Sequence, residues 1–331
     1  MSDILVAGET VIDFLPDGEE SLVDTETFHR RSGGAPANVA VGLSRLGRAP
    51  LFWTRLSTDP FGDHLASTLT ENGVKPDLIE RDPDAATTLA FVSLDPDADR
   101  AFSFRRDDTA DTRLRPGTVD DGTLSKVEWV HTGGVTLADE PSRTATLDLM
   151  VRASRSGAIV SFDPNARPEL FDGDDLVESH RRAIELADVV KATASDLVHT
   201  GILDEPAEEG GGLAGAICAR GPHTALVTRG ADGALARATT DAPWNTTGSA
   251  IVVEQPGYRV RPVDTTGAGD AFTAGAVRSL VAGESLADAL AFANAVAARS
   301  TTETGAMSAL PTRQEVERFR EFRDVSNPSQ G

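Results

Sequence analysis

The chain has 331 residues, 40% of them hydrophobic, and a net charge of −21. This length and composition predict a folded, enzyme-sized globular protein. The chain has 52 acidic and 31 basic residues. This acidic balance argues against nucleic acid as a partner, because phosphate backbones are bound by clustered Lys and Arg. No apolar run approaches the roughly 20 residues of a membrane helix, so no membrane partner is expected.

The amino-terminal segment and the scarce residue types indicate the compartment. Residues 1–8 have no basic stretch and only a short apolar run, so we expect a cytoplasmic protein without a signal peptide. Cys218 is the single cysteine, which excludes an intrachain disulfide. Only three basic residues are lysines, namely Lys75, Lys126 and Lys191. An acidic surface with few lysines suits high salt, where self-repulsion is screened, so we predict a halophilic source.

Taken in chain order, the apolar pattern predicts an α/β fold. Residues 4–8 predict a buried strand, residues 36–46 a helix that ends at Gly47, residues 51–56 a strand and residues 61–69 a helix. Residues 75–106 alternate as strands do. Further strands are expected at 127–131, 158–162, 188–191, 224–228, 233–238 and 250–260. Further helices are expected near 142–155, 175–186, 212–220, 268–282 and 286–300. This alternation predicts a mainly parallel sheet with helices on both faces.

The organisation of the chain predicts one domain over residues 1–331, since no linker interrupts it. The polar amino-terminal stretch and the later alternating strands predict a small sheet that stands off this domain as a lid. Its expected parts are residues 9–33 and 75–115.

The most informative segment is Asp264-Thr-Thr-Gly-Ala-Gly-Asp-Ala-Phe-Thr-Ala-Gly275. Gly267 and Gly269 let backbone amides approach a ligand, and the amides of a helix start attract anions such as phosphate. A carboxylate there would repel phosphate, so Asp270 predicts a base for a hydroxyl beside a transferring phosphoryl group. The chain lacks the Gly-Lys pair of a Walker loop, so phosphate must be held another way. A turn that serves only helix packing is the alternative.

A second segment is Arg31-Ser-Gly-Gly-Ala-Pro-Ala-Asn-Val-Ala-Val-Gly42. Gly33 and Gly34 precede a helix and permit a hinge. Asn38 offers a donor and an acceptor, which suits sugar hydroxyls. Asp13 follows the first strand, where it is either a turn residue or a ligand contact. Taken alone, a glycine pair at a helix start is more often structural, and an aspartate near the end of a first strand is slightly more often a turn residue.

The two segments resemble the two signatures of the ribokinase-like (PfkB-type) carbohydrate kinases, and the resemblance covers essentially the whole chain. Three shorter pieces fit the same family: Ser161-Phe-Asp-Pro-Asn-Ala-Arg167, Val227-Thr-Arg-Gly230 and Asn294-Ala-Val-Ala-Ala298. The resemblance implies a three-layer sandwich with a mainly parallel central sheet and a small β-sheet lid. It also implies ATP, Mg²⁺ and transfer of the γ-phosphoryl group to a sugar hydroxyl.

The resemblance also implies roles for particular residues. Asp270 matches the base, and the amides of Gly267, Ala268 and Gly269 match the anion hole. The positions that match the sugar site are Asp13, Gly33, Gly34 and Asn38. Those that match the nucleotide side are Thr228, Gly230, Gly233 and Asn294. Asp264 and Thr266 match positions that support a monovalent cation, K⁺, in some members. The family's Asn-x-x-Glu motif is replaced by Thr193 and Asp196, and Asp196 is expected to order a water on Mg²⁺.

The identity of the sugar depends on two stretches. Residues 104–114 resemble the Arg-x-x-Ser/Thr-Ala-Asp stretch of fructokinases, and residues 162–171 resemble one shared by fructokinases and 2-keto-3-deoxygluconate kinases. Arg167 suits a sugar-acid carboxylate, the nucleotide phosphates or a nearby acid. Arg105 or Arg106 is expected to reach the substrate from the lid, or to form a lid salt bridge.

The triplet Thr109-Ala110-Asp111 favours D-fructose, phosphorylated at its primary 6-hydroxyl. A 2-keto-3-deoxygluconate kinase is the nearest alternative, followed by a ribokinase or nucleoside kinase and by a non-catalytic sugar or nucleotide sensor. A homodimer through the lid is also expected.

Overall fold

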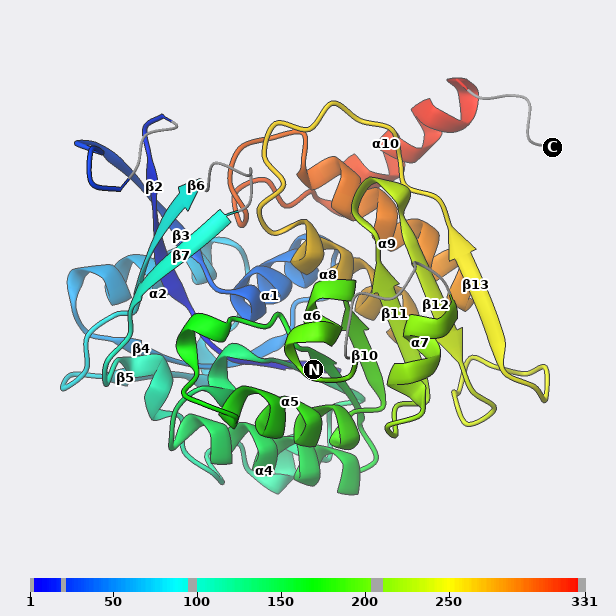
Figure 1. Cartoon of the computed structure of the whole chain (residues 1–331), viewed down its shortest axis with the longest axis horizontal. Coiled ribbons are helices and arrows are strands. Elements are labelled where there is room, and N and C mark those ends of the chain that lie inside the picture. The colour runs from blue at the N-terminus through cyan, green and yellow to red at the C-terminus, as the bar shows by residue number, and fades with distance from the viewer. Residues whose placement is uncertain (1–2, 19–21, 95–99, 204–210, 327–331) are drawn as a thin grey trace.

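The first strand, β1 (Ile4–Ala7), is buried along its whole length because all four side chains are apolar. Ile4 and Val6 enter one hydrophobic core, while Leu5 and Ala7 enter a second core on the opposite face. Side chains alternate between the two faces of a sheet, so β1 must be covered on both sides. The computed structural model describes residues 3–18, 22–94, 100–203 and 211–326 (Figure 1).

The large sheet has nine strands in the order β13-β12-β11-β10-β9-β8-β1-β4-β5. Seven of them run parallel, and β12 and β13 are added in antiparallel fashion at one edge. Their bounds are β4 (Leu51–Ser57), β5 (Ile79–Asp82), β8 (Trp129–Gly133), β9 (Ile159–Asp163), β10 (Val189–Ala192), β11 (Thr224–Thr228), β12 (Ala234–Ala238) and β13 (Ile251–Gln255). The predicted mainly parallel sheet is confirmed.

Helices cover both faces of this sheet and complete three layers (Figure 1). The helices that supply residues to the first core are α1 (Ala35–Arg45), α2 (Pro60–Glu71), α8 (Ala268–Val281), α9 (Leu286–Ser300) and α10 (Arg313–Ser326). Those that supply residues to the second are α3 (Asp121–Leu124), α4 (Ser142–Arg155), α5 (Asp175–Leu186), α6 (Ala194–His199) and α7 (Gly211–Cys218). No helix in the described ranges is long and apolar enough to cross a membrane.

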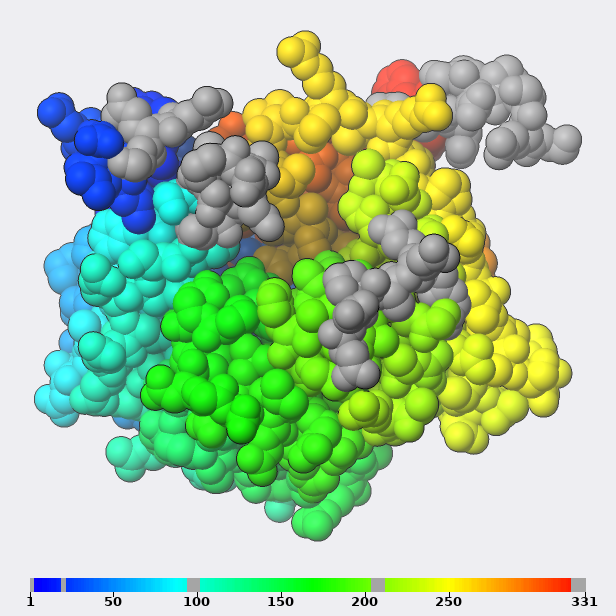
Figure 2. Space-filling model, in the orientation of Figure 1, coloured from blue at the N-terminus to red at the C-terminus, as the bar shows by residue number. Residues whose placement is uncertain are grey.

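A second, four-stranded sheet stands off the first in the order β3-β2-β6-β7 (Figure 1). Its strands are β2 (Val11–Pro16), β3 (Phe28–Gly33), β6 (Leu89–Leu94) and β7 (Arg100–Arg105). Phe14 of β2 stacks on Phe91 of β6, with ring centroids 5.2 Å apart. The residues expected in the lid also include β5, which instead pairs with β4 in the large sheet. The space-filling view shows a hollow between the cyan lid strands, the green loops and the gold start of α8 (Figure 2).

Candidate active site

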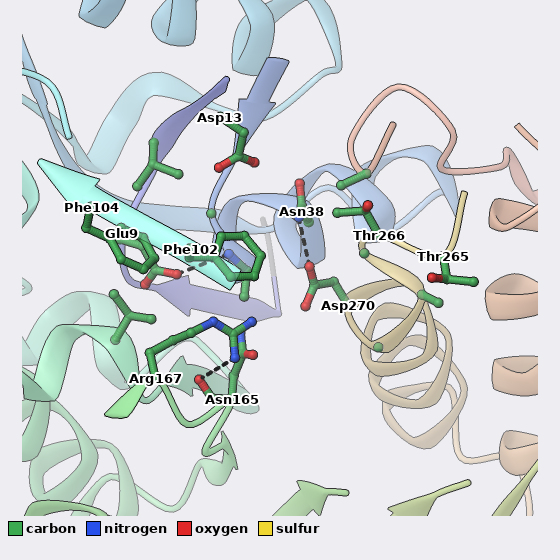
Figure 3. A pocket seen from close by; sticks show the side chains of 18 of the residues that line it. Glu9, Asp13, Asn38, Phe102, Phe104, Asn165, Arg167, Thr265, Thr266 and Asp270 are labelled. Atoms are coloured by element: carbon green, nitrogen blue, oxygen red, sulfur yellow. Dashed lines mark hydrogen bonds between the residues drawn. The ribbon is translucent and has the colours of Figure 1, made fainter. Parts of the chain in front are cut away.

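A cavity of about 220 Å³ lies between the large sheet, the lid and α8 (Figure 3). It lies beyond the carboxyl ends of β1 and β8. The chain leaves β1 toward β4 on one side, and β8 returns on its other side. Open α/β sheets bind ligands at such a switch in strand order.

The start of α8 forms one wall. Gly267 adopts a left-handed conformation with φ of 74°. A Cβ at this position would lie 2.8 Å from the Ala306 Cβ, so both the backbone angle and the space require glycine. The turn aims the first residues of α8 at the cavity and places Asp270 in its first helical turn.

Asp270 is the acid at the centre of this wall (Figure 3). The Asn38 Nδ2 of α1 donates a hydrogen bond of 2.8 Å to its Oδ2. Burial raises the pKa of Asp270 to about 7, and the nearby Asp163 carboxylate adds to this rise. The Asn38 hydrogen bond and the cations Lys191 and Arg167 act in the opposite direction. A carboxyl with a pKa near neutrality can exchange a proton with a bound hydroxyl.

The amides of the glycine turn are not all alike. The Ala268 amide donates to the Thr265 carbonyl at 3.2 Å and so is engaged inside the turn. Within the described residues, the amides of Gly267 and Gly269 donate to no backbone carbonyl. The structure therefore leaves two of the three predicted amides for an anion, and the third only if its bond is shared or broken.

The lid side of the cavity contains the second predicted constellation. Asp13, Gly34 and Asn38 line the cavity, and Asp13 points into it (Figure 3). Gly33 lies directly against Asp13, since a Cβ there would be 2.1 Å from the Asp13 Oδ2. Gly34 has a φ of 101°, and a Cβ there would be 2.7 Å from the carbonyl oxygen of Glu9. Because these two glycines have no Cβ, β3 and the start of α1 can pack closely against β2 and the segment that follows β1.

Glu9 was missed by the sequence analysis, and Arg106 was left open. Glu9 follows β1 and is 2% exposed, and its Oε1 accepts a 3.1 Å hydrogen bond from the Ala35 amide. Burial raises the pKa of Glu9 to about 7. Arg106 is 7% exposed and donates to Asp111 at 2.8 Å and to Asp139. A charged residue straight after a buried strand was the signal that could have identified Glu9.

Three buried polar atoms of the cavity's own residues have no hydrogen-bond partner in the described structure: Glu9 Oε2, Asn38 Oδ1 and Arg106 Nη2. Unpaired buried polar atoms are costly, and most such groups in native proteins have a partner. All three atoms belong to residues that line one cavity, and two acceptors beside one donor suit a ligand that carries hydroxyl groups.

The remaining wall combines aromatic rings with a cation. Phe102 and Phe104 of β7 stack at a centroid distance of 5.9 Å, and the Arg167 guanidinium lies 5.1 Å from the Phe102 ring centroid. Arg105, one of the two lid arginines predicted to reach the substrate, is exposed and bonds to Ser103 and to the Phe104 carbonyl. Side chains alternate across a strand, so Arg105 points away from the face that holds Phe102 and Phe104.

The residues predicted for the nucleotide side lie outside this cavity. Thr228 ends β11, and Gly230 and Gly233 take left-handed angles in the following turn. The Asn294 Nδ2 donates to the Gln255 and Pro256 carbonyls at 3.0 and 3.1 Å. In this structure, Asn294 thus fastens α9 to the end of β13.

The residues predicted to serve cations also have partners within the protein. The Asp196 carboxylate accepts hydrogen bonds from the Thr193 amide and hydroxyl and from the Ala166 amide, at 2.9, 2.7 and 3.0 Å. The Asp264 carboxylate accepts from the Thr266 amide and hydroxyl and from the Gly305 amide, at 2.9, 2.6 and 2.8 Å. Neither aspartate lines the cavity, whereas Thr266 does.

The sequence matches the pfkB family of carbohydrate kinases over residues 1–313. The chain belongs to this family. Its members are phosphotransferases that act on a sugar hydroxyl. This pfkB-family chain is 35% identical to the fructokinase of Vibrio alginolyticus over 326 residues, which cover 96% of this chain and 99% of that protein. It is 36% identical to the fructokinase of Klebsiella pneumoniae over 322 residues, which cover 95% and 98%.

Solved structures of the family superpose over nearly the whole chain and confirm the ribokinase-like fold. The fructokinase of Xylella fastidiosa with bound ATP has a TM-score of 0.85 at 31% identity, covering 98% of this chain and 100% of that one. The fructokinase of Vibrio cholerae O395 with fructose, ADP and calcium has a TM-score of 0.79 at 33% identity, covering 96% and 99%.

Proposed function

We propose that the protein is an ATP-dependent fructokinase that transfers the γ-phosphoryl group of ATP to the 6-hydroxyl of D-fructose. The observation that carries this proposal is the position of Asp270, whose carboxyl has a pKa of about 7 and lies in the first turn of a helix. A base and an anion site are thus adjacent in one cavity. Fructokinases that match nearly the full chain support fructose as the sugar.

The sugar is proposed to bind between the lid and the large sheet. Glu9 Oε2 and Asn38 Oδ1 accept its hydroxyl protons, and Arg106 Nη2 donates to a sugar oxygen, so that all three buried atoms gain partners. Asp13 binds a further hydroxyl from the lid side. Phe102 and Phe104 cover the apolar face of the sugar and exclude water that would otherwise hydrolyse ATP.

The transfer needs a base and a place for negative charge. Asp270 accepts the proton of the 6-hydroxyl while that oxygen forms its bond to the γ-phosphorus. The bond from this phosphorus to the ADP oxygen breaks in the same step. Asn38 keeps the Asp270 carboxylate aimed at the hydroxyl. The amides of Gly267 and Gly269, with Ala268 when its turn bond is shared, donate to the phosphoryl oxygens.

We assign Mg²⁺ chiefly to the ATP phosphates. The described residues contain no cluster of three His, Cys, Asp or Glu that could hold a metal alone, and Mg²⁺ fits this because it keeps several waters and needs few carboxylates. When bound, it neutralises charge on the phosphates. Asp196 is proposed to act only through a water, since its oxygens already accept three hydrogen bonds.

A K⁺ ion is proposed beside the glycine turn, at the segment that contains Asp264 and Thr266. The Thr266 hydroxyl donates to Asp264, so its oxygen retains lone pairs for a cation. A double mutant of the fructokinase of Vibrio cholerae O395 has been solved with fructose, ADP and a potassium ion bound.

The nucleotide wall, the domain organisation and the assembly complete the proposal. Thr228, Gly230, Gly233 and Asn294 shape the wall beside the adenosine of ATP. One domain spans residues 1–331, with the sheet of β2, β3, β6 and β7 as its lid.

A second copy of the chain covers that lid in a cytoplasmic homodimer, which light scattering in molar salt would detect as twice the mass of one chain.

A 2-keto-3-deoxygluconate kinase is the second candidate, because the Arg167 guanidinium faces the cavity and suits a carboxylate. A panel of sugars assayed for ADP release in molar salt tests both. Fructose should give the highest kcat/KM, with glucose, ribose and 2-keto-3-deoxygluconate as comparisons. A higher kcat/KM for the keto-acid would reject fructose, higher values for ribose or a nucleoside would favour those kinases, and no release with any sugar would favour a non-catalytic sensor.

A further inference from the structure

Lys191 is a charged side chain of the active-site cavity that the proposed mechanism has not used. It belongs to β10 and reaches the cavity with 8% of its surface exposed. Its Nζ lies 3.0 Å from the point that a Cβ on Gly269 would occupy. The ammonium group therefore lies directly against the glycine turn that begins α8.

The ammonium group is held in place and charged. The Lys191 Nζ donates a 2.9 Å hydrogen bond to the Asp163 Oδ2 inside the protein, and both side chains are less than one-tenth exposed. The Asp163, Asp196 and Asp270 carboxylates raise the pKa of Lys191 against the effect of burial. A charge fixed before the substrate arrives costs no reorganisation when negative charge develops beside it.

The small size of Gly269 is what brings the cation and the turn together. A side chain at this position would lie between the ammonium group and the space in front of the helix start. The other two lysines, Lys75 and Lys126, are exposed, so Lys191 is the buried lysine of the chain. The turn amides and Lys191 thus face the cavity together, although no lysine follows a glycine in the sequence.

We propose that Lys191 is a catalytic residue whose ammonium group binds the transferring phosphoryl group from beneath the glycine turn. This inference rests on the proposed kinase function. The sugar oxygen gains the bond to phosphorus, the ADP oxygen keeps the electrons of the broken bond, and the hydroxyl proton goes to Asp270. Lys191 gives up no proton and stabilises the three phosphoryl oxygens through its charge.

The test compares Lys191→Met with Lys75→Met and Lys126→Met, which remove charge from exposed positions. Lys191→Met should lower kcat by about 100-fold or more, as loss of one preorganised charged donor does, with little change in the KM for fructose. Both surface variants should retain wild-type kcat. A second readout is binding of ADP with aluminium fluoride, which mimics the transferring group. Lys191→Met should bind ADP alone as the wild type does and bind this mimic at least about tenfold more weakly.

A purely structural role for Lys191 would be to neutralise Asp163, and a double variant separates the two roles. Asp163→Asn with Lys191→Met removes both charges of the buried pair, so no carboxylate is left uncompensated. We expect this double variant to fold, as checked by circular dichroism, and to remain as slow as Lys191→Met. Recovery of the kcat of Asp163→Asn alone would overturn the proposal.

The mimic also separates this inference from the proposed function. Its binding requires no turnover, so it tests Lys191 even if fructose is not the substrate. Equal binding of the mimic by the wild type and Lys191→Met would overturn the role of Lys191 while fructose-dependent ADP release by the wild type stands. Failure of the wild type to bind the mimic would overturn both.

Discussion

Replacement of Asp270 by Asn is the most informative perturbation, because it should lower activity and raise stability. Asn keeps the shape of the side chain, and its oxygen can still accept the 2.8 Å hydrogen bond from Asn38. Removal of a general base costs between about 100-fold and 10 000-fold in rate. We therefore expect kcat to fall within that range in a coupled assay of ADP release.

The magnitude of the stability effect follows from the raised pKa. A rise from 3.8 to about 7 spans about three units, or about 4 kcal/mol at 1.4 kcal/mol per unit. This is an upper limit, because the carboxylate borders a cavity that water can enter, and we expect about 1–2 kcal/mol. Below its unfolded pKa, the Asp270 carboxyl is protonated in both the folded and the unfolded state, and its burial does not oppose folding. As the pH rises to about 7, the unfolded state loses this proton first, so the free energy of unfolding falls.

Above pH 7 the wild type is thus destabilised by the full cost of burying the Asp270 carboxylate, and Asp270→Asn does not have this cost. Denaturant unfolding should show the variant as more stable at pH 8 and nearly equal to the wild type at pH 4. The exposed Asp172→Asn is the matched control and should change neither stability nor kcat. The kcat/KM of the wild type should fall as the pH drops below about 7. A variant with kcat within tenfold of the wild type would refute the base, and a stability difference independent of pH would refute the raised pKa.

Three further predictions concern the sugar and the cation. Glu9→Gln should raise the KM for fructose about tenfold with kcat nearly unchanged, because Gln keeps the shape but loses an acceptor; an unchanged KM would remove Glu9 from the sugar site. Arg167→Ala should reduce kcat/KM for fructose by less than about tenfold, and a loss near 100-fold that is confined to 2-keto-3-deoxygluconate would show that the acid is the natural substrate. Replacement of K⁺ by choline at constant ionic strength should lower kcat in the wild type but not in Asp264→Asn, and equal wild-type rates in both salts would contradict the cation site.

The helices were predictable from the sequence wherever local signals bracket them. The helix expected at 268–282 is observed as α8, and that expected at 142–155 is α4 with identical bounds. Sheet membership was harder, because an alternating pattern does not reveal which sheet a strand joins. Residues 79–82 lie in the range expected for the lid, yet they pair with β4 through Thr54 and Ile79 in the large sheet. That pairing is a long-range contact that no local pattern encodes.

The candidate site divides in a similar way. Asp270 and Asn38 belong to the two motif segments, Asp13 follows the first strand, and all three were predicted and line one cavity. Lys191 was not predicted as a site residue, because its role depends on the approach of β10 to a helix that begins nearly 80 residues later. The sequence named both Arg105 and Arg106. Side chains alternate along β7, so Arg105 points away from the face that holds Phe102 and Phe104, whereas Arg106, just after the strand, lines the cavity. This distinction requires the bounds of β7, which the sequence alone does not give.

The charge of the whole chain and the charge of the site act over different distances. A net charge of −21 opposes the approach of ATP, but in molar salt the Debye length is about 3 Å, so exposed carboxylates repel it little. Lys191, which lies against the glycine turn, is nearly buried and is screened far less. High salt should therefore remove most of the repulsion while it preserves the local positive charge at the glycine turn. By this reasoning an acidic surface and an anion-binding site are compatible, provided that the cations of the site are the buried ones.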